Sequence, residues 1–170
     1  MAAPALAVAQ AGDVQLTPRW EYVADTVMGG VSRGSATAQQ VAGRAAMRLT
    51  GDVSLDNNGG FVQIAFDLAD GAAFDASGYE GIALEVYGNG AAYDLRLRTS
   101  ALTRPWQSFR AEFVARPAWQ RIEIPFAALQ AHRTDAAFDP ATLRRIGILA
   151  IGREMQADIA VGSVSLYAAR

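Results

Sequence analysis

Ten residues near the start of the chain, 23–32, run Val-Ala-Asp-Thr-Val-Met-Gly-Gly-Val-Ser. Two adjacent glycines, one carboxylate and two hydroxyl groups stand here among apolar residues. A second pair of adjacent glycines follows in Asp56-Asn57-Asn58-Gly59-Gly60-Phe61. Glycine adopts backbone conformations that other residues resist, and Asp and Asn side chains accept hydrogen bonds from nearby backbone amides. The two stretches therefore predict two tight loops, each next to a strand.

Many short runs outside these loops alternate apolar and polar residues, which is the pattern of half-buried β-strands. The runs are 19–24, 45–53, 61–68, 82–87, 93–98, 109–114, 122–126, 145–151 and 159–167. Residues 145–151 are nearly all apolar and predict a central strand, and Gly162 predicts a bulge in the last strand. Helical signal is confined to single turns at 127–130 and 140–144. Short strands separated by Gly and Pro turns predict an all-β fold, an antiparallel β-sandwich.

Composition limits the chemistry that the chain can perform. The 170 residues include no cysteine, and all 15 basic residues are arginine, which leaves no lysine for Schiff-base chemistry. The single histidine, His132, lies in a polar stretch that we predict to be a loop, with no serine and carboxylate arranged beside it as a triad. We therefore expect no catalytic residues, no cofactor and no enzymatic activity. The net charge of −2 gives no general attraction to nucleic acid.

Two of the quoted strings carry a resemblance to a known family. Asp-x-Val-Met-Gly-Gly-Val-Ser at 25–32 and Asn-Asn-Gly-Gly-Phe at 57–61 resemble the complex I intermediate-associated protein 30 (CIA30) family. The stretches 88–93 and 119–126 follow in the order that this family shows. The resemblance implies a jelly roll of the galactose-binding-like type. It also implies a non-enzymatic role, with protein partners among the subunits of a membrane redox complex, typically respiratory complex I, which the protein helps to assemble or stabilise.

The two glycine loops admit a structural and a functional interpretation. In the first, the glycines need positive φ, and Asp25, Asn57 and Asn58 cap backbone amides. In the second, both loops form one binding rim that consists of Asp25, Met28, Gly29, Gly30, Ser32, Asn57, Asn58, Gly59 and Gly60. Strand ends gather at the rims of a sandwich, so we expect the loops to lie close together. Oxygen ligands for a structural Ca²⁺ are present, but their spacing matches no calcium loop, and we predict no metal site.

A second candidate surface lies on the two strands around residues 93–98 and 109–114. Arg96 and Arg98 alternate along the first strand, Arg110 lies on the second, and Trp106 lies in the loop between them. One interpretation is a solvated face with cross-strand ion pairs. The alternative is a binding face of Arg96, Arg98 and Trp106 for a sugar, a peptide or a protein. Carbohydrate binding is therefore the second functional hypothesis, because many jelly rolls bind sugars.

The start of the chain differs from the rest in composition. Residues 1–15 are rich in alanine, with Ala-x-Ala patterns, and we expect a disordered start or the remnant of a secretory signal, followed by one domain over 16–170. The signal-like pattern favours a periplasmic location; the alternative is a cytoplasmic protein that is peripheral to the inner membrane. The sequence contains no apolar run of 18 or more residues, so we expect no membrane span.

Overall fold

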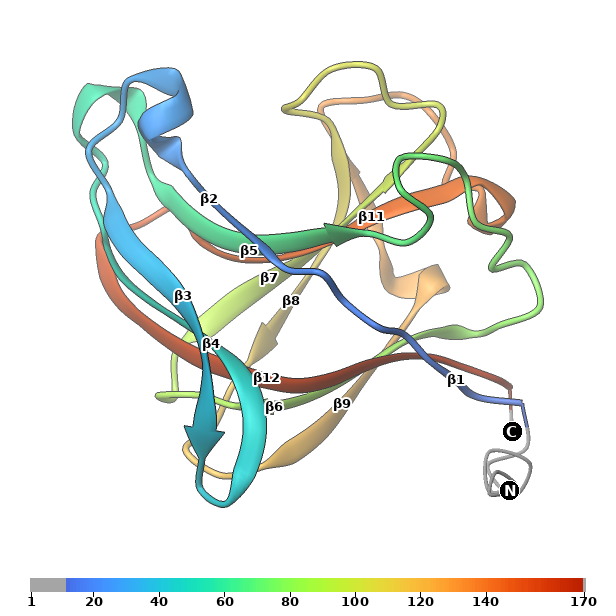
Figure 1. The fold of residues 1–170 in the computed structure, drawn as a ribbon. Coiled ribbons are helices and arrows are strands. Elements are labelled where there is room, and N and C mark those ends of the chain that lie inside the picture. Colours follow the sequence, from blue (N-terminus) through green and yellow to red (C-terminus); the bar gives the residue numbers. More distant parts are fainter. Residues whose placement is uncertain (1–11, 170) are drawn as a thin grey trace.

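Two antiparallel six-stranded sheets pack face to face in the computed structural model, which describes residues 12–169 (Figure 1). The first sheet contains, in spatial order, β3 (Arg33–Val41), β4 (Arg44–Val53), β12 (Met155–Tyr167), β6 (Gly81–Tyr87) and β9 (Gln120–Pro125), with β1 (Val14–Gln15) also paired to β12. The second contains β10 (Gln130–His132), β8 (Ser108–Val114), β7 (Ala92–Thr99), β11 (Leu143–Ile151), β5 (Phe61–Asp67) and β2 (Glu21–Ala24). The predicted antiparallel β-sandwich is confirmed.

The core lies between the two sheets and is built mainly from one parity of the inner strands. Its fully buried members include Leu49, Ile64, Leu84, Leu95, Ile148 and Val164. Complete burial of a side chain of this size contributes roughly 1.5–3 kcal/mol, so the alternating pattern favours the face-to-face packing of the sheets. β11 lies between β7 and β5, which confirms that 145–151 is a central strand.

The last strand contains the predicted bulge. The register between β12 and β6 shifts between Val161 and Ser163, so Gly162 is the extra residue. A Cβ atom at Gly162 would lie 3.1 Å from the ring of Trp119. Glycine is therefore needed here because the indole packs directly on the backbone.

Within residues 12–169, four short 3₁₀ helices connect the strands. They are η1 (Asp25–Met28), η2 (Asp56–Asn58), η3 (Phe126–Ala128) and η4 (Pro140–Thr142). In η4 the Asp139 carboxylate accepts a hydrogen bond from the Ala141 backbone at 3.0 Å, which caps the start of the helix. Among the described residues, no helix has the length and apolar character needed to cross a membrane.

The structure differs from the sequence-based prediction at His132 and near the start of the chain. His132 does not lie in a loop but ends the edge strand β10, half-buried and paired with Ser108 of β8. A polar edge strand with solvent on one side gives no apolar alternation, which explains the error. Val14 and Gln15 pair with β12 beyond the end of β4, so regular structure begins before residue 16, while residues 1–11 lie outside the described part of the chain.

Candidate functional site

The two glycine loops lie side by side at one end of the sandwich (Figure 1). β2 runs antiparallel to β5, with Ala24 opposite Val62, so the end of one strand meets the start of the other. η1 directly follows β2, and η2 precedes β5 by two residues. The predicted proximity of the loops is therefore confirmed, and it results from this strand pairing.

The Asp25 carboxylate joins the loops from inside. Asp25 is fully buried and accepts hydrogen bonds from the Ser32 backbone at 3.0 Å and the Ser32 hydroxyl at 2.5 Å. Its Oδ2 also accepts from the backbone amides of Gly60 at 2.5 Å and Phe61 at 3.3 Å. We call these four residues, Asp25, Ser32, Gly60 and Phe61, the Asp25 clasp. One buried anion thus satisfies amides from both loops, as a buried charge requires.

Further hydrogen bonds connect the clasp to neighbouring strands. The Ser32 hydroxyl, which donates to Asp25, accepts a hydrogen bond from the Ser54 backbone at 2.8 Å. The Gly60 carbonyl accepts from the Gly152 backbone in the turn between β11 and β12 at 3.0 Å. The clasp therefore connects segments that lie on both sheets, and we expect it to hold this end of the sandwich rigid.

The four glycines of the loops are needed for two different reasons. Gly29 and Gly60 have φ of +88° and +140°, which favours glycine. Gly59 has a φ of −81°, and Gly30 is likewise outside the left-handed range, so the prediction of positive φ is wrong for these two. Cβ atoms at positions 30 and 59 would lie 2.6 Å from Oδ1 and 2.9 Å from Cγ of Asp25 respectively. These two glycines make room for the carboxylate.

The electrostatics of Asp25 follow from the same contacts. Burial alone raises the pKa of this carboxyl, because it disfavours the charged form. The hydrogen bonds from Ser32, Gly60 and Phe61 favour the anion and outweigh burial, so the pKa of Asp25 lies below its ordinary value. Asp25 is therefore an anion at neutral pH, with its oxygens occupied by donors of the protein itself.

Exposed apolar side chains lie on both loops, beside the exposed polar residues Thr26, Asp56 and Asn57. Val27, Met28, Val31 and Leu55 are between 42% and 73% exposed, and we call these four residues the η1–η2 tip. Gly29 and Asn57 are also exposed, whereas Gly30 and the polar atoms of Asp25 and Ser32 face inward. The Asn58 backbone belongs to η2, and its side chain lies outside the described part of the structure.

Sequence reasoning identified Met28 but missed the other three apolar residues of the tip. Their position in the chain was the signal that could have identified these three residues. Val27, Val31 and Leu55 lie in or beside the glycine loops, where no strand alternation directs a side chain into the core. The predicted binding role of the loops remains a prediction.

The second candidate surface consists largely of internal contacts. Arg96 and Arg110 both donate to the buried Asp94 carboxylate, with shortest distances of 2.8 and 3.1 Å. Arg98 donates to the carbonyls of Arg104 at 2.8 Å and Gln107 at 2.6 Å, which anchors the loop between β7 and β8. Trp106, in the same loop, is 52% exposed. Arg96 thus fits the ion-pair interpretation, while Trp106 remains accessible to a ligand.

The described residues also bear on whether the chain could hold a metal ion. Nowhere in residues 12–169 do three or more His, Cys, Asp or Glu side chains gather as a group that could hold a metal ion. The oxygens of Asp25 instead receive hydrogen bonds from amides and a hydroxyl.

The two packed antiparallel sheets define a β-sandwich module of the jelly-roll type. A family model described as Complex I intermediate-associated protein 30 (CIA30) matches residues 10–165. The chain therefore belongs to the CIA30 family. Comparison with curated proteins gives no match.

Solved structures with the same fold include two carbohydrate-binding modules. The family 11 module of the cellulosomal cellulase Lic26A-Cel5E of Clostridium thermocellum is 14% identical with a TM-score of 0.76, and the match covers 93% of this chain and 95% of that one. The family 30 module of Cel9D-Cel44B from the same organism is 15% identical with a TM-score of 0.59, covering 92% and 97%. At these identities the likeness extends to the fold alone.

Proposed function

We propose that this CIA30 protein is a non-catalytic binding module that helps to assemble or stabilise a membrane redox complex of the complex I type. The observation that carries the proposal is the η1–η2 tip, which places four exposed apolar side chains on two loops joined by the Asp25 clasp. Exposed apolar groups that cluster on a surface are typical of protein-binding sites. Loops held in advance by internal hydrogen bonds lose little conformational entropy on binding, which favours affinity.

The family description supports a protein partner of this kind, since it associates the family with complex I intermediates. Met28, one of the four residues of the η1–η2 tip, has a flexible side chain that adapts to an irregular apolar surface. A tip of this composition suits a hydrophobic patch on a subunit that has not yet joined its complex.

Charged substitutions in the tip provide the test. We expect the double variant Met28→Asp, Leu55→Asp to reduce recovery of complex I-type subunits at least tenfold, because each buried apolar side chain contributes roughly 1.5–3 kcal/mol. The measurement is affinity capture from membranes of the native host after crosslinking, with the subunits quantified by mass spectrometry. Val114→Asp is the matched control, because Val114 is 51% exposed on β8, which β7 and β11 separate from β5. Equal recovery with both proteins would contradict the proposal.

Carbohydrate binding in the periplasm is the alternative, and Trp106 favours it. The indole is half exposed on a loop that Arg98 anchors, and the Arg104 guanidinium lies 5.9 Å from the ring centroid. An exposed aromatic ring beside a hydrogen-bond donor is a common element of sugar sites. One structure of similar fold holds a β-1,3-1,4-mixed-linked tetrasaccharide.

If the protein binds carbohydrate, substitution of Trp106 and not of the η1–η2 tip should weaken binding. Calorimetry with the mixed-linked tetrasaccharide should then give saturable binding that Trp106→Ala weakens at least tenfold, because the stacking platform is removed. The tip variant Met28→Asp, Leu55→Asp should leave the sugar affinity unchanged. Absence of heat with the unsubstituted protein would rule out this ligand.

A further inference from the structure

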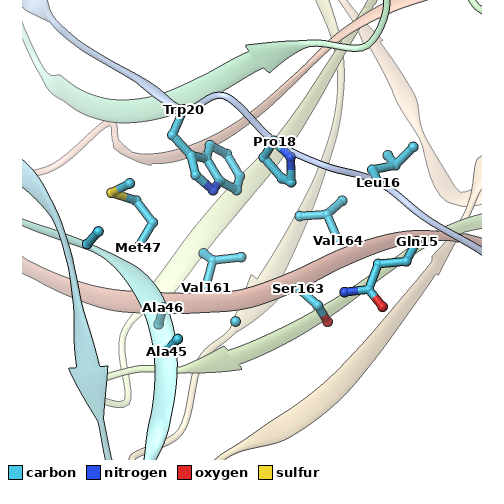
Figure 2. A pocket seen from close by; sticks show the side chains of 12 residues that line it. Gln15, Leu16, Pro18, Trp20, Ala45, Ala46, Met47, Val161, Ser163 and Val164 are labelled. Carbon is cyan, nitrogen blue, oxygen red and sulfur yellow. The ribbon is translucent and has the colours of Figure 1, made fainter.

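A pocket of about 280 Å³ lies on the flank of the sandwich, apart from the η1–η2 tip and from Trp106. Figure 2 shows it between the chain segment that leads from β1 to β2 and the strands β4 and β12. We call it the flank pocket. Its lining consists of Gln15, Leu16, Pro18, Trp20, Ala38, Ala45, Ala46, Met47, Val161, Gly162, Ser163 and Val164.

Small residues keep the flank pocket open. Ala38 of β3 is paired with Met47 of β4, and Ala45 and Ala46 precede Met47 on the same strand. A larger side chain at Ala38 or Ala45, which share one face of β3 and β4 with Met47, would occupy the space. Trp20, whose ring packs edge-on against Phe66 at 4.9 Å between centroids, closes the opposite side. The volume of about 280 Å³ lies just below the range of roughly 300–1,000 Å³ that small-molecule sites have.

The polar groups of the flank pocket are few and uncharged. None of its lining residues carries a charge. The Trp20 indole N–H has no hydrogen-bond partner among the residues that the structure describes, and Figure 2 shows its nitrogen on the side of the ring toward Met47 and Val161. The Gln15 amide supplies a polar group at the other end, whereas Ser163 points to the opposite side of β12 from Val161 and Val164. The pocket therefore combines apolar walls with a free donor at one end.

We propose that the flank pocket binds a small uncharged ring compound that carries a hydrogen-bond acceptor, such as an aryl ketone. A charged ligand would lose its hydration without gaining a counter-charge. A sugar ring would bring more hydroxyl groups than the Trp20 N–H and the Gln15 amide can satisfy. A pure hydrocarbon would fill the space but leave the Trp20 N–H without an acceptor, at the cost of an unsatisfied donor. A flat ring with a carbonyl group fills the apolar space and accepts a hydrogen bond from the Trp20 N–H.

Three probes of similar shape test the proposal: acetophenone, ethylbenzene and benzoate. We expect acetophenone to shift the indole N–H signal of Trp20 in a saturable manner in ¹H–¹⁵N spectra. Ethylbenzene should bind about 5–10-fold more weakly, because it lacks the acceptor, and a net hydrogen bond contributes about 1 kcal/mol. Benzoate should give no saturable shift. Saturable binding of benzoate, or equal affinity for acetophenone and ethylbenzene, would overturn the proposal.

Two variants locate the binding. Ala38→Leu should weaken acetophenone binding at least tenfold by filling the pocket, while Ala118→Leu, at an exposed position outside the lining, should leave it unchanged. Trp20→Phe keeps the aromatic wall but removes the donor, so ligand-detected spectra should show acetophenone binding as weakly as ethylbenzene. Circular dichroism melts confirm that each variant folds. If acetophenone binds Ala38→Leu and Trp20→Phe as tightly as the unsubstituted protein, or binds none of the proteins, the assignment is wrong.

Discussion

Asp25→Ala is expected to lower the free energy of unfolding by about 3–5 kcal/mol. The substitution removes the acceptor of three backbone amides and one hydroxyl that come from both glycine loops. Asp25 is fully buried, so solvent does not replace the lost acceptor without opening the loops. Urea unfolding at neutral pH measures the change. Asp56→Ala is the matched control, because Asp56 is an exposed acid on the neighbouring loop; it should change stability by less than about 0.5 kcal/mol.

The difference in stability between the unsubstituted protein and Asp25→Ala depends on pH. The sign of this dependence follows from the lowered pKa of Asp25. The folded protein holds the Asp25 carboxyl as an anion more strongly than the unfolded chain does. Its contribution to stability is therefore fully present above the ordinary Asp pKa of about 3.9. That contribution is lost as the pH falls through the lowered pKa of the folded state. We expect the stability difference between the unsubstituted protein and Asp25→Ala to shrink under acid; a difference that stays constant from neutral pH to about pH 2 would contradict the role of the anion.

The strand pattern was readable from the sequence wherever a strand buries one face. β5, β6 and β7 alternate clearly because their apolar parity faces the core. β3 was not predicted, because it is an edge strand of the first sheet and most of its residues, from Arg33 to Gln40, face solvent. Such a strand forms by pairing with β4, and pairing of backbone groups leaves no periodic trace in the side chains.

The candidate site was predictable in its position but not in its internal arrangement. Adjacent glycines and the carboxylate at position 25 indicated two loops that meet, and the pairing of β2 with β5 brings them together. The sequence did not show that Asp25 points inward, because an Asp next to two glycines fits an exposed rim equally well. The flank pocket was also beyond sequence reasoning, because it depends on how Trp20 packs over residues of β4 and β12.

Gly59→Val is expected to destabilise the protein by about 2–4 kcal/mol, for a steric and not a conformational reason. The φ of −81° at Gly59 suits any residue. A Cβ atom there would, however, lie 2.9 Å from Cγ of Asp25 and 3.0 Å from Cα of Gly30. The valine must therefore displace the carboxylate from the amides that it binds. Gly78→Val is the matched control, because a Cβ at Gly78 meets no atom within 4 Å and its φ is not in the left-handed range.

Combining Gly59→Val with Asp25→Ala separates this mechanism from general overpacking. If the valine acts by displacing the Asp25 carboxylate, its cost falls once that carboxylate is absent, because Asp25→Ala has already removed both the obstacle and the hydrogen bonds. The double variant should then be more stable than the sum of the two single changes predicts, by at least about 1 kcal/mol. Urea unfolding of all four proteins gives this coupling energy. Additive costs would show that Gly59 is required for a reason other than the room it leaves for Asp25.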